Sequence, residues 1–186
     1  MEGQSIVMNK SLLLHICCAP CCVMSLQTFR DKGYDVLGYF FNPNIHPYRE
    51  FVSRKETLRS FLDEENITYI MDEGYPLEDF LRLVLANEQD RCLSCYRLRL
   101  ETAAQKAAEL GIEHFTTTLL ISPYQKHESI KTTGEEIAQN YGVSFLYVDL
   151  RPLFRESQRL AREKGFYMQS YCGCIFSEKE RYLKNN

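Results

Sequence analysis

Short apolar runs alternate along the chain with longer segments in which apolar residues recur every three or four positions. The runs have the length of buried strands, and the longer segments have the period of helices that cover a sheet. This pattern predicts strands over 11–16, 35–41, 67–71, 114–120 and 143–148. It predicts helices over 20–32, 48–65, 77–86, 93–110, 127–141 and 152–164.

The alternation indicates an α/β fold with a mostly parallel sheet that helices cover on both faces. Residues 1–186 are expected to form one domain, since a chain of this length has the size of an ordinary domain. In open parallel sheets, ligands bind outside the carboxyl ends of the strands. The residues that directly follow the predicted strands are therefore the first place to look for chemistry.

Composition and charge narrow the function classes only a little. Hydrophobic residues make up 45% of the chain and charged residues 25%, a normal balance for a domain whose core needs no disulfides. The formal net charge of −3 does not indicate nucleic-acid binding, so any such contact must come from a local patch. The sequence shows no leader segment and no apolar run of membrane-spanning length, and we expect a cytoplasmic protein whose thiols stay reduced.

Eight cysteines are the unusual feature of the chain, and none lies inside a predicted strand or in the middle of a predicted helix. They form three groups: Cys17 to Cys22 with four, Cys92 with Cys95, and Cys172 with Cys174. In a reducing compartment, such spacing is typical of metal ligands or redox groups, and a helix start lowers the pKa of a thiol. Cys22 is expected inside the first helical turn and is interpreted as a filler, which leaves seven candidate ligands.

The number of candidate ligands bears on the kind of metal. A structural zinc site takes four ligands, and seven thiols exceed that number. Thiolates in such excess favour an iron–sulfur cluster, and a cubane cluster would leave up to three thiols for a second metal or a redox pair. The tight spacing of Cys172 and Cys174 suits an easily reduced disulfide.

Nucleotide-binding signatures are missing from the sequence. It contains no G-x-G-x-x-G fingerprint, no Walker A motif and no G-x-S-x-G elbow. The loop after the first strand, where such folds hold phosphate, carries cysteines instead. We therefore expect neither ATP nor NAD as a cofactor, and nothing in the sequence suggests cobalamin.

Five blocks spread over nearly the whole chain carry a family resemblance: His-Ile-Cys-Cys-Ala-Pro-Cys at 15–21, Phe-Asn-Pro-Asn-Ile-His-Pro at 41–47, Arg-Cys-Leu-Ser-Cys-Tyr-Arg-Leu-Arg-Leu at 91–100, Phe-Thr-Thr-Thr-Leu at 115–119, and Tyr-Cys-Gly-Cys-Ile-Phe-Ser at 171–177. In these blocks and their order, the chain resembles the epoxyqueuosine reductase family QueH. The resemblance implies a Rossmann-like three-layer αβα fold, similar to that of the nucleotide α-hydrolases, with the pyrophosphate loop replaced. It implies an oxidoreductase for the last step of tRNA queuosine synthesis, the two-electron reduction of epoxyqueuosine to queuosine.

The same resemblance implies a substrate and a cofactor. The substrate would be tRNA with epoxyqueuosine at the wobble position, and the cofactor a 4Fe–4S cluster fed by an unidentified electron donor, with no membrane partner. The thiols expected on the cluster are Cys17, Cys18, Cys92 and Cys95. Those expected on a second iron, or in a redox pair, are Cys21, Cys172 and Cys174. The alternative is that Cys17 and Cys18 bind different centres.

Other side chains are candidates for proton transfer and substrate binding. His46 and Tyr48 follow the second strand and are candidate proton donors, with a role in the turn as the alternative. The candidate substrate-binding residues are Ser122, Tyr124, Tyr171, Arg155 and Arg159. The two arginines belong to a helical stripe that could meet phosphates, and the alternative is a solvated helix face.

Two other functions remain open from the residues alone. A tRNA sulfurtransferase would also use a cysteine-bound cluster, but it needs ATP, and the missing phosphate loop argues against it. A zinc-binding module without enzymatic activity would hold zinc with the same thiols. Analysis of bound iron, sulfide and zinc separates these cases.

Overall fold

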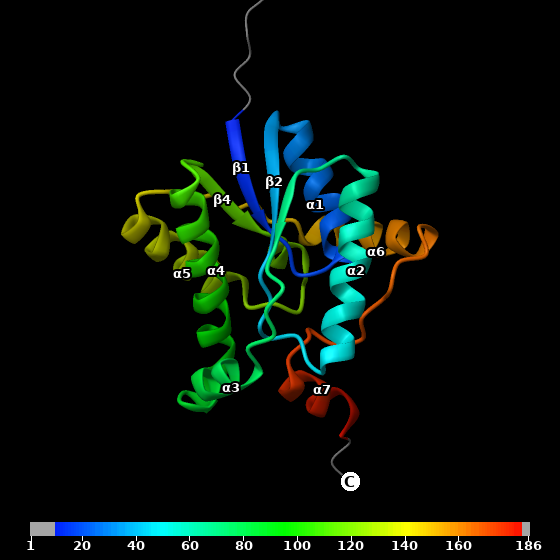
Figure 1. Cartoon of the computed structure of the whole chain (residues 1–186), viewed down its shortest axis with the longest axis vertical. Coiled ribbons are helices and arrows are strands. Elements are labelled where there is room, and N and C mark those ends of the chain that lie inside the picture. The colour runs from blue at the N-terminus through cyan, green and yellow to red at the C-terminus, as the bar shows by residue number, and fades with distance from the viewer. Residues whose placement is uncertain (1–9, 184–186) are drawn as a thin grey trace, which may run out of the picture.

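The computed structural model describes residues 10–183; residues 1–9, on which the expectation of no leader rests, and 184–186 lie outside the described residues. Five parallel strands form one sheet in the order β3-β2-β1-β4-β5 (Figure 1). The strands are β1 (Lys10–His15), β2 (Tyr34–Phe40), β3 (Tyr69–Met71), β4 (His114–Thr117) and β5 (Ser144–Phe145). This confirms the predicted α/β fold with its parallel sheet.

Helices cover both faces of the sheet, which completes the three layers of a Rossmann-like fold. On one face lie α1 (Ala19–Asp31), α2 (Tyr48–Glu64) and α6 (Phe154–Glu163), and on the other lie α4 (Arg91–Glu109) and α5 (His127–Tyr141) (Figure 1). Two shorter helices, α3 (Leu77–Leu85) and α7 (Ile175–Tyr182), lie beyond the carboxyl ends of the strands, at the bottom of Figure 1. None of the described helices is long and apolar enough to cross a membrane.

β1 lies in the centre of the sheet, and its apolar residues are buried on both faces. Leu12, Leu13 and Leu14 are completely buried, as continuous apolar runs are in parallel sheets. In register, His15 at the end of β1 lies opposite Tyr39 of β2 and Thr117 of β4. The central strands therefore end at one common edge, and the segments that follow β1 and β4 meet there.

Three elements differ most from the sequence prediction. β4 ends at Thr117 because its hydroxyl accepts a hydrogen bond from Leu119 N at 3.2 Å and turns the chain into the 3₁₀ turn η2 (Thr118–Ile121). β5 pairs over two residues only, at the edge of the sheet. α7 has no counterpart in the prediction, because its residues are mostly polar and none is buried.

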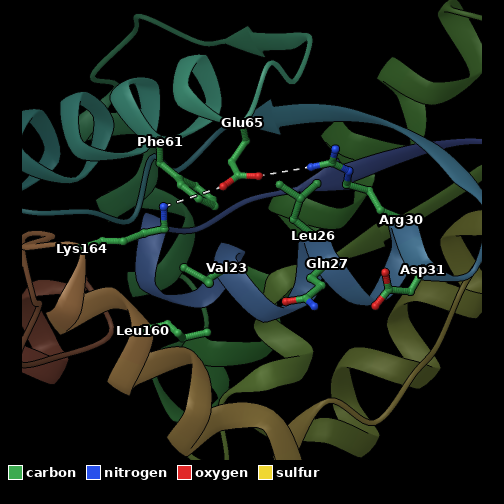
Figure 2. A pocket seen from close by; sticks show the side chains of 9 residues that line it. All are labelled: Val23, Leu26, Gln27, Arg30, Asp31, Phe61, Glu65, Leu160 and Lys164. Carbon is green, nitrogen blue, oxygen red and sulfur yellow. Dashed lines mark hydrogen bonds and ion pairs between the residues drawn. The ribbon is translucent and has the colours of Figure 1, made fainter.

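Figure 2 shows a hollow of about 360 Å³ between α1, α2 and α6. Apolar side chains of the three helices line it, and Glu65 at its rim pairs with Arg30 at 3.2 Å and with Lys164 at 3.8 Å. No cysteine lines the hollow. It therefore belongs to the packing of this face and is separate from the thiols.

Candidate metal and redox site

The connectivity of the sheet reverses between β1 and β4. β1 is followed by β2 on one side, whereas β4 is followed by β5 on the other. Such a switch point opens a crevice outside the carboxyl ends of the strands and is the usual ligand site of these sheets. Here the segment after β1 carries Cys17, Cys18 and Cys21, and the segment after β4 carries Thr118.

The thiols of Cys17, Cys18 and Cys21, called the thiol trio below, form a compact buried group. Their sulfur atoms all lie within 4.8 Å of one another, and those of Cys17 and Cys18 are 3.6 Å apart. Cys18 is the N-cap of α1 and Cys21 lies in its first turn, so their spacing of three residues places both on one side of the helix start. Among the described residues, no other three potential metal ligands lie so close together.

The surroundings of the thiol trio favour one shared negative charge. Hydrogen bonds from the thiols of Cys18 and Cys21 lower the pKa of Cys17 well below its usual value. Thr118 donates to Cys17 Sγ at 3.3 Å, and its oxygen accepts from the Cys17 amide at 3.0 Å. Burial raises the pKa of Cys18, and hydrogen bonding to Cys17 raises that of Cys21. A thiolate at the start of α1 also lies at the positive end of the helix dipole. The dipole favours the deprotonated form of the thiol, which is the form that binds metals.

His15 supports the same edge from inside the sheet. Its Nδ1 lies 2.8 Å from Thr117 Oγ1, and its Nε2 lies 3.1 Å from Phe41 O. Because that carbonyl can only accept, Nε2 carries the proton. Burial, with the nearby charge of Arg99, lowers the pKa of His15 to about 3, so the ring is neutral. His15 therefore joins β1, β2 and β4 through both ring nitrogens.

The other four candidate thiols lie at the start of α4 and just before α7. Cys92 and Cys95 occupy the first turns of α4, whereas Cys172 and Cys174 directly precede α7. Burial raises the pKa of Cys95 to about 12; Arg99 opposes this effect, and Cys172 adds to it. Burial and Cys172 also raise the pKa of Cys92. The two pairs are therefore close enough to interact electrostatically.

Side chains dock the C-terminal segment against this edge. Arg91 at the start of α4 pairs with Glu180 of α7, and its guanidinium lies over the Phe176 ring at 5.3 Å from the centroid. Gln169 donates from Nε2 to Cys18 Sγ, so the same segment also contacts the thiol trio. All seven candidate thiols thus gather at the carboxyl edge of the sheet.

Arg99 is a buried cation within this edge. It lies on α4 one turn after Cys95 and is 3% exposed. Nη2 donates to Asn42 Oδ1 at 2.7 Å, Nη1 lies 3.9 Å from Cys95 Sγ, and Nε has no hydrogen-bond partner among the described residues. Within the described part of the chain, no carboxylate pairs with Arg99. A buried cation needs an anion, and Cys17 is placed to supply it, because hydrogen bonds from its neighbours and the charge of Arg99 both lower its pKa.

The observed grouping of the thiols bears on their expected division between two centres. The structure places Cys21 with Cys17 and Cys18, because all three follow β1 within one helical turn. Cys92 and Cys95 lie near the C-terminal cysteine pair. The assignment of each thiol to a cluster or to a second centre stays a prediction.

The two candidate proton donors differ in exposure. His46 is 2% exposed, its ring packs against Phe80 and Tyr75, and neither ring nitrogen has a hydrogen-bond partner among the described residues. Burial lowers the pKa of His46, which keeps the ring neutral. Tyr48 is 58% exposed and packs its ring against Tyr75. The backbone N of His46 donates to Gly173 O at 2.8 Å, so His46 lies beside the C-terminal cysteines.

The three candidate substrate contacts outside the arginine stripe have different surroundings. Tyr124 is exposed beyond η2 and packs edge-on against Phe154 at 5.8 Å. Ser122 is engaged by its own loop, since its oxygen accepts from the Tyr124 amide at 3.3 Å. Tyr171 donates to His46 O, and burial raises its pKa to about 12. Tyr124 alone among them presents a free ring face to solvent.

The arginine stripe is partly neutralised by its own helix. Arg159 pairs with Glu156 at 2.6 Å and also with Glu163, so its charge is shared between two acidic neighbours. Arg155 is exposed on the same helix. A role for the two arginines in substrate binding stays a prediction.

Two buried arginines of the site were not among the sequence candidates. Arg54 follows Phe51 by three residues and precedes Leu58 by four, and Arg99 has the same relation to Tyr96 and Ala103. Both therefore lie on the apolar face of a predicted helix. A charged residue in that phase is a signal that the sequence contains, since arginine is rarely buried without a partner.

Seven thiols gather at the carboxyl edge of the sheet, three of them in one compact buried group, which indicates an α/β protein with a thiol-based redox or metal site. A sequence model of the family described as "Epoxyqueuosine reductase QueH" matches residues 12–180. The chain belongs to the epoxyqueuosine reductase QueH family and is an oxidoreductase. The resemblance found in the cysteine blocks is thereby confirmed.

Relatives from several bacteria carry the name epoxyqueuosine reductase QueH. The protein from Dehalococcoides mccartyi is 39% identical over 179 residues, which cover 96% of this chain and 98% of the relative. The protein from Thermotoga maritima is 34% identical over 185 residues, which cover 94% of each. The protein from Helicobacter pylori is 37% identical over 182 residues, which cover 90% of this chain but 49% of the relative, so the chain spans about half of its length.

Proposed function

We propose that this enzyme reduces epoxyqueuosine at the wobble position of tRNA to queuosine. The epoxide oxygen leaves as water and a carbon–carbon double bond forms, so the reaction consumes two electrons and two protons. The observation that carries the proposal is the gathering of seven cysteines at the switch point, in a chain whose family is named for this reaction.

The residues fit an iron–sulfur cluster of the 4Fe–4S type. The thiol trio offers three soft sulfur ligands in one buried group, and four further thiols lie at the same edge. An anionic cluster would also neutralise Arg99, which has no carboxylate partner among the described residues. The thiols that remain would hold a second iron or form the Cys172–Cys174 redox pair. A bound cluster supplies electrons one at a time, and the substrate needs two.

The protein's own side chains would bind the substrate and supply protons. Tyr48 is exposed two residues after His46, whose backbone binds Gly173, so its hydroxyl is a candidate to donate to a departing oxygen, whereas His46 is buried. The open ring of Tyr124 offers a surface for stacking of an unpaired base, and Arg155 offers a phosphate contact. The enzyme would work in the cytoplasm, where tRNA is modified, and would take electrons from an external donor.

Metal analysis followed by turnover tests the proposal. The protein is purified without oxygen, its iron and sulfide are measured, and its visible absorption is recorded before and after dithionite. Reduced protein is then mixed with an anticodon stem–loop that carries epoxyqueuosine, and the nucleosides are analysed by mass spectrometry. We expect a brown protein that converts epoxyqueuosine to a product lacking one oxygen.

Matched cysteine variants sharpen this experiment. Cys17→Ser should lose cluster absorption and turnover, whereas Cys22→Ser, five residues along the same segment, should keep both, because Cys22 lies outside the thiol trio. A colourless protein that holds zinc alone would refute the cluster. An iron-loaded protein that leaves epoxyqueuosine unchanged, but transfers sulfur to tRNA when ATP is added, would establish the sulfurtransferase instead.

A further inference from the structure

Arg54 is a buried arginine of α2 whose donors point at the backbone of the C-terminal cysteine segment. Its side chain is 2% exposed. Nη1 donates to Cys172 O at 3.0 Å, Nη2 donates to Tyr171 O at 3.0 Å, and Nε donates to Glu50 Oε1 at 2.7 Å. The two terminal nitrogens of the guanidinium thus bind consecutive carbonyl groups of one short segment.

The segment that Arg54 binds has no regular structure of its own. Residues 166–174 run between α6 and α7 without forming a helix or a strand. Their position therefore depends on individual contacts, such as the bond from His46 N to Gly173 O at 2.8 Å and that from the Tyr171 hydroxyl to His46 O. In such a segment, the loss of two charged hydrogen bonds should shift the balance between docked and open forms.

Gly173 shows how closely the segment fits against α2. Its φ of +118° is a conformation that favours glycine. A Cβ at this position would lie 3.1 Å from Arg54 Nη1 and 3.0 Å from Ile45 Cγ1, which is closer than ordinary contact. The backbone of the cysteine pair therefore rests directly on the guanidinium, with no room for a side chain between them.

A second layer of contacts fixes Arg54 itself. Glu50, one turn earlier on α2, pairs with the guanidinium at 2.6 Å and is 9% exposed. The Tyr167 hydroxyl donates to the other carboxylate oxygen of Glu50, so the far end of the same segment is tied to the same pair. Glu50 and Arg54 thus bind the segment at Tyr167 and at Tyr171–Cys172, on both sides of Gln169, which contacts Cys18.

We propose that Arg54 is a positioning residue that fastens the Cys172–Cys174 segment over the thiol trio, so that the two groups of cysteines form one site. The guanidinium contacts the backbone of the cysteine pair and leaves its sulfur atoms free. The inference concerns how the thiols are assembled and does not depend on which substrate the assembled site reduces. It complements the proposed function, which requires that assembly.

Cysteine alkylation tests the fastening in the full-length, metal-free protein. The chain is exposed to N-ethylmaleimide without oxygen, and the modification of each cysteine is followed by peptide mass spectrometry. Arg54→Lys keeps the positive charge but cannot donate to both carbonyl groups. We expect Cys174 to react about tenfold faster in this variant, as the loss of a charged hydrogen bond implies, while fully buried Cys22 stays protected.

Controls separate fastening from general stability. Arg59→Lys, on the exposed part of the same helix, where it pairs with Glu56 and Glu73, should alkylate as the wild type does. An unchanged rate at Cys174 in Arg54→Lys would overturn the proposal. Equal acceleration at Cys22 would report global unfolding, and Gly173→Ala then decides. Because no iron or tRNA is present, failure here is distinct from failure of the reductase assay.

Gly173→Ala disturbs the same contact by changing the segment instead of the arginine. It tests the proposal if Arg54→Lys does not fold. It retains Arg54 and Glu50 and forces the segment away from the guanidinium. Faster alkylation of Cys174 is expected again with Cys22 protected, and unchanged alkylation would overturn the proposal. In the iron-loaded protein, the same variant should release iron to a chelator several-fold faster than the wild type does.

Discussion

Replacing Arg99 by methionine tests whether its buried guanidinium serves the thiol site. The substitution removes a positive charge 3.9 Å from Cys95 Sγ and leaves a long apolar side chain in its place. In the metal-free protein, removal of a buried cation relieves a desolvation cost, whereas Asn42 Oδ1 loses its donor. Because these effects oppose each other, the free energy of unfolding should change by less than about 2 kcal/mol.

The iron-loaded protein should respond more strongly, and the structure sets the scale. With an effective dielectric constant of about 20, a unit charge 3.9 Å from a sulfur stabilises its thiolate by about 4 kcal/mol. For a charge spread over a bound cluster, at about twice this distance, the guanidinium would contribute about 2 kcal/mol. This energy corresponds to about 90 mV for a one-electron couple. The midpoint potential of Arg99→Met should therefore fall by up to about 90 mV.

Three measurements and a neighbouring control variant check this prediction. Midpoint potentials come from redox titration followed by electron paramagnetic resonance, iron and sulfide are counted per chain, and urea unfolding of the metal-free protein gives its stability. Arg97→Met is the control, since Arg97 lies on the same helix, is exposed and pairs with Glu136 at 2.8 Å. Such a surface pair contributes about 1 kcal/mol or less.

Two results would contradict this role of Arg99. If Arg99→Met binds as much iron as Arg97→Met and has the same midpoint potential, the guanidinium does not compensate the charge of the site. If the metal-free Arg99→Met protein is destabilised by far more than about 2 kcal/mol, Arg99 serves the fold rather than the thiols.

Three further substitutions have expected outcomes of their own. Cys22→Ala should keep full iron and sulfide content, because Cys22 fills the core beside the trio, and loss of iron would make it a ligand. Gly134→Ala places a Cβ 2.5 Å from the Phe145 ring, so urea unfolding should show a loss of about 1–3 kcal/mol, and an unchanged midpoint would contradict this contact. Ser157→Ala removes the 2.7 Å bond to Pro20 O that joins α6 to the start of α1, and should cost about 1–3 kcal/mol in the same assay; a smaller loss would mean that another donor replaces it.

Hydrophobic periodicity predicts the bounds of an element correctly where burial and backbone hydrogen bonding agree. α5 begins and ends at the predicted residues, because Gly142 with φ of +65° stops it. The predicted strand over 114–120 includes Leu119 and Leu120, yet both are buried in η2. Hydrophobic periodicity indicates burial, and these residues are buried whether they form a strand or a 3₁₀ turn. The turn depends on one hydrogen bond to Thr117, which leaves no mark on the periodicity.

The cysteine spacing located the site but not its internal arrangement. Short spacings predict which thiols lie together within a segment, as they do for Cys18 and Cys21. Which segments meet depends on long-range contacts such as those of Gln169 with Cys18 and of Arg91 with Glu180, for which the local sequence has no signal. The buried arginines were detectable in principle, because each occupies an apolar helix position.

The start of α1 also explains why this fold is better suited to thiolates than to phosphates. A phosphate loop works by presenting free backbone N–H groups at a helix start. Here Pro20 has no N–H group, and the Cys17 N–H is already bonded to Thr118 Oγ1 at 3.0 Å. The helix dipole remains, but side chains of the protein itself supply the anions that use it. An ATP-dependent sulfurtransferase would need those donors for its triphosphate, whereas a reductase needs only the thiols, so the geometry of this one turn favours the reductase.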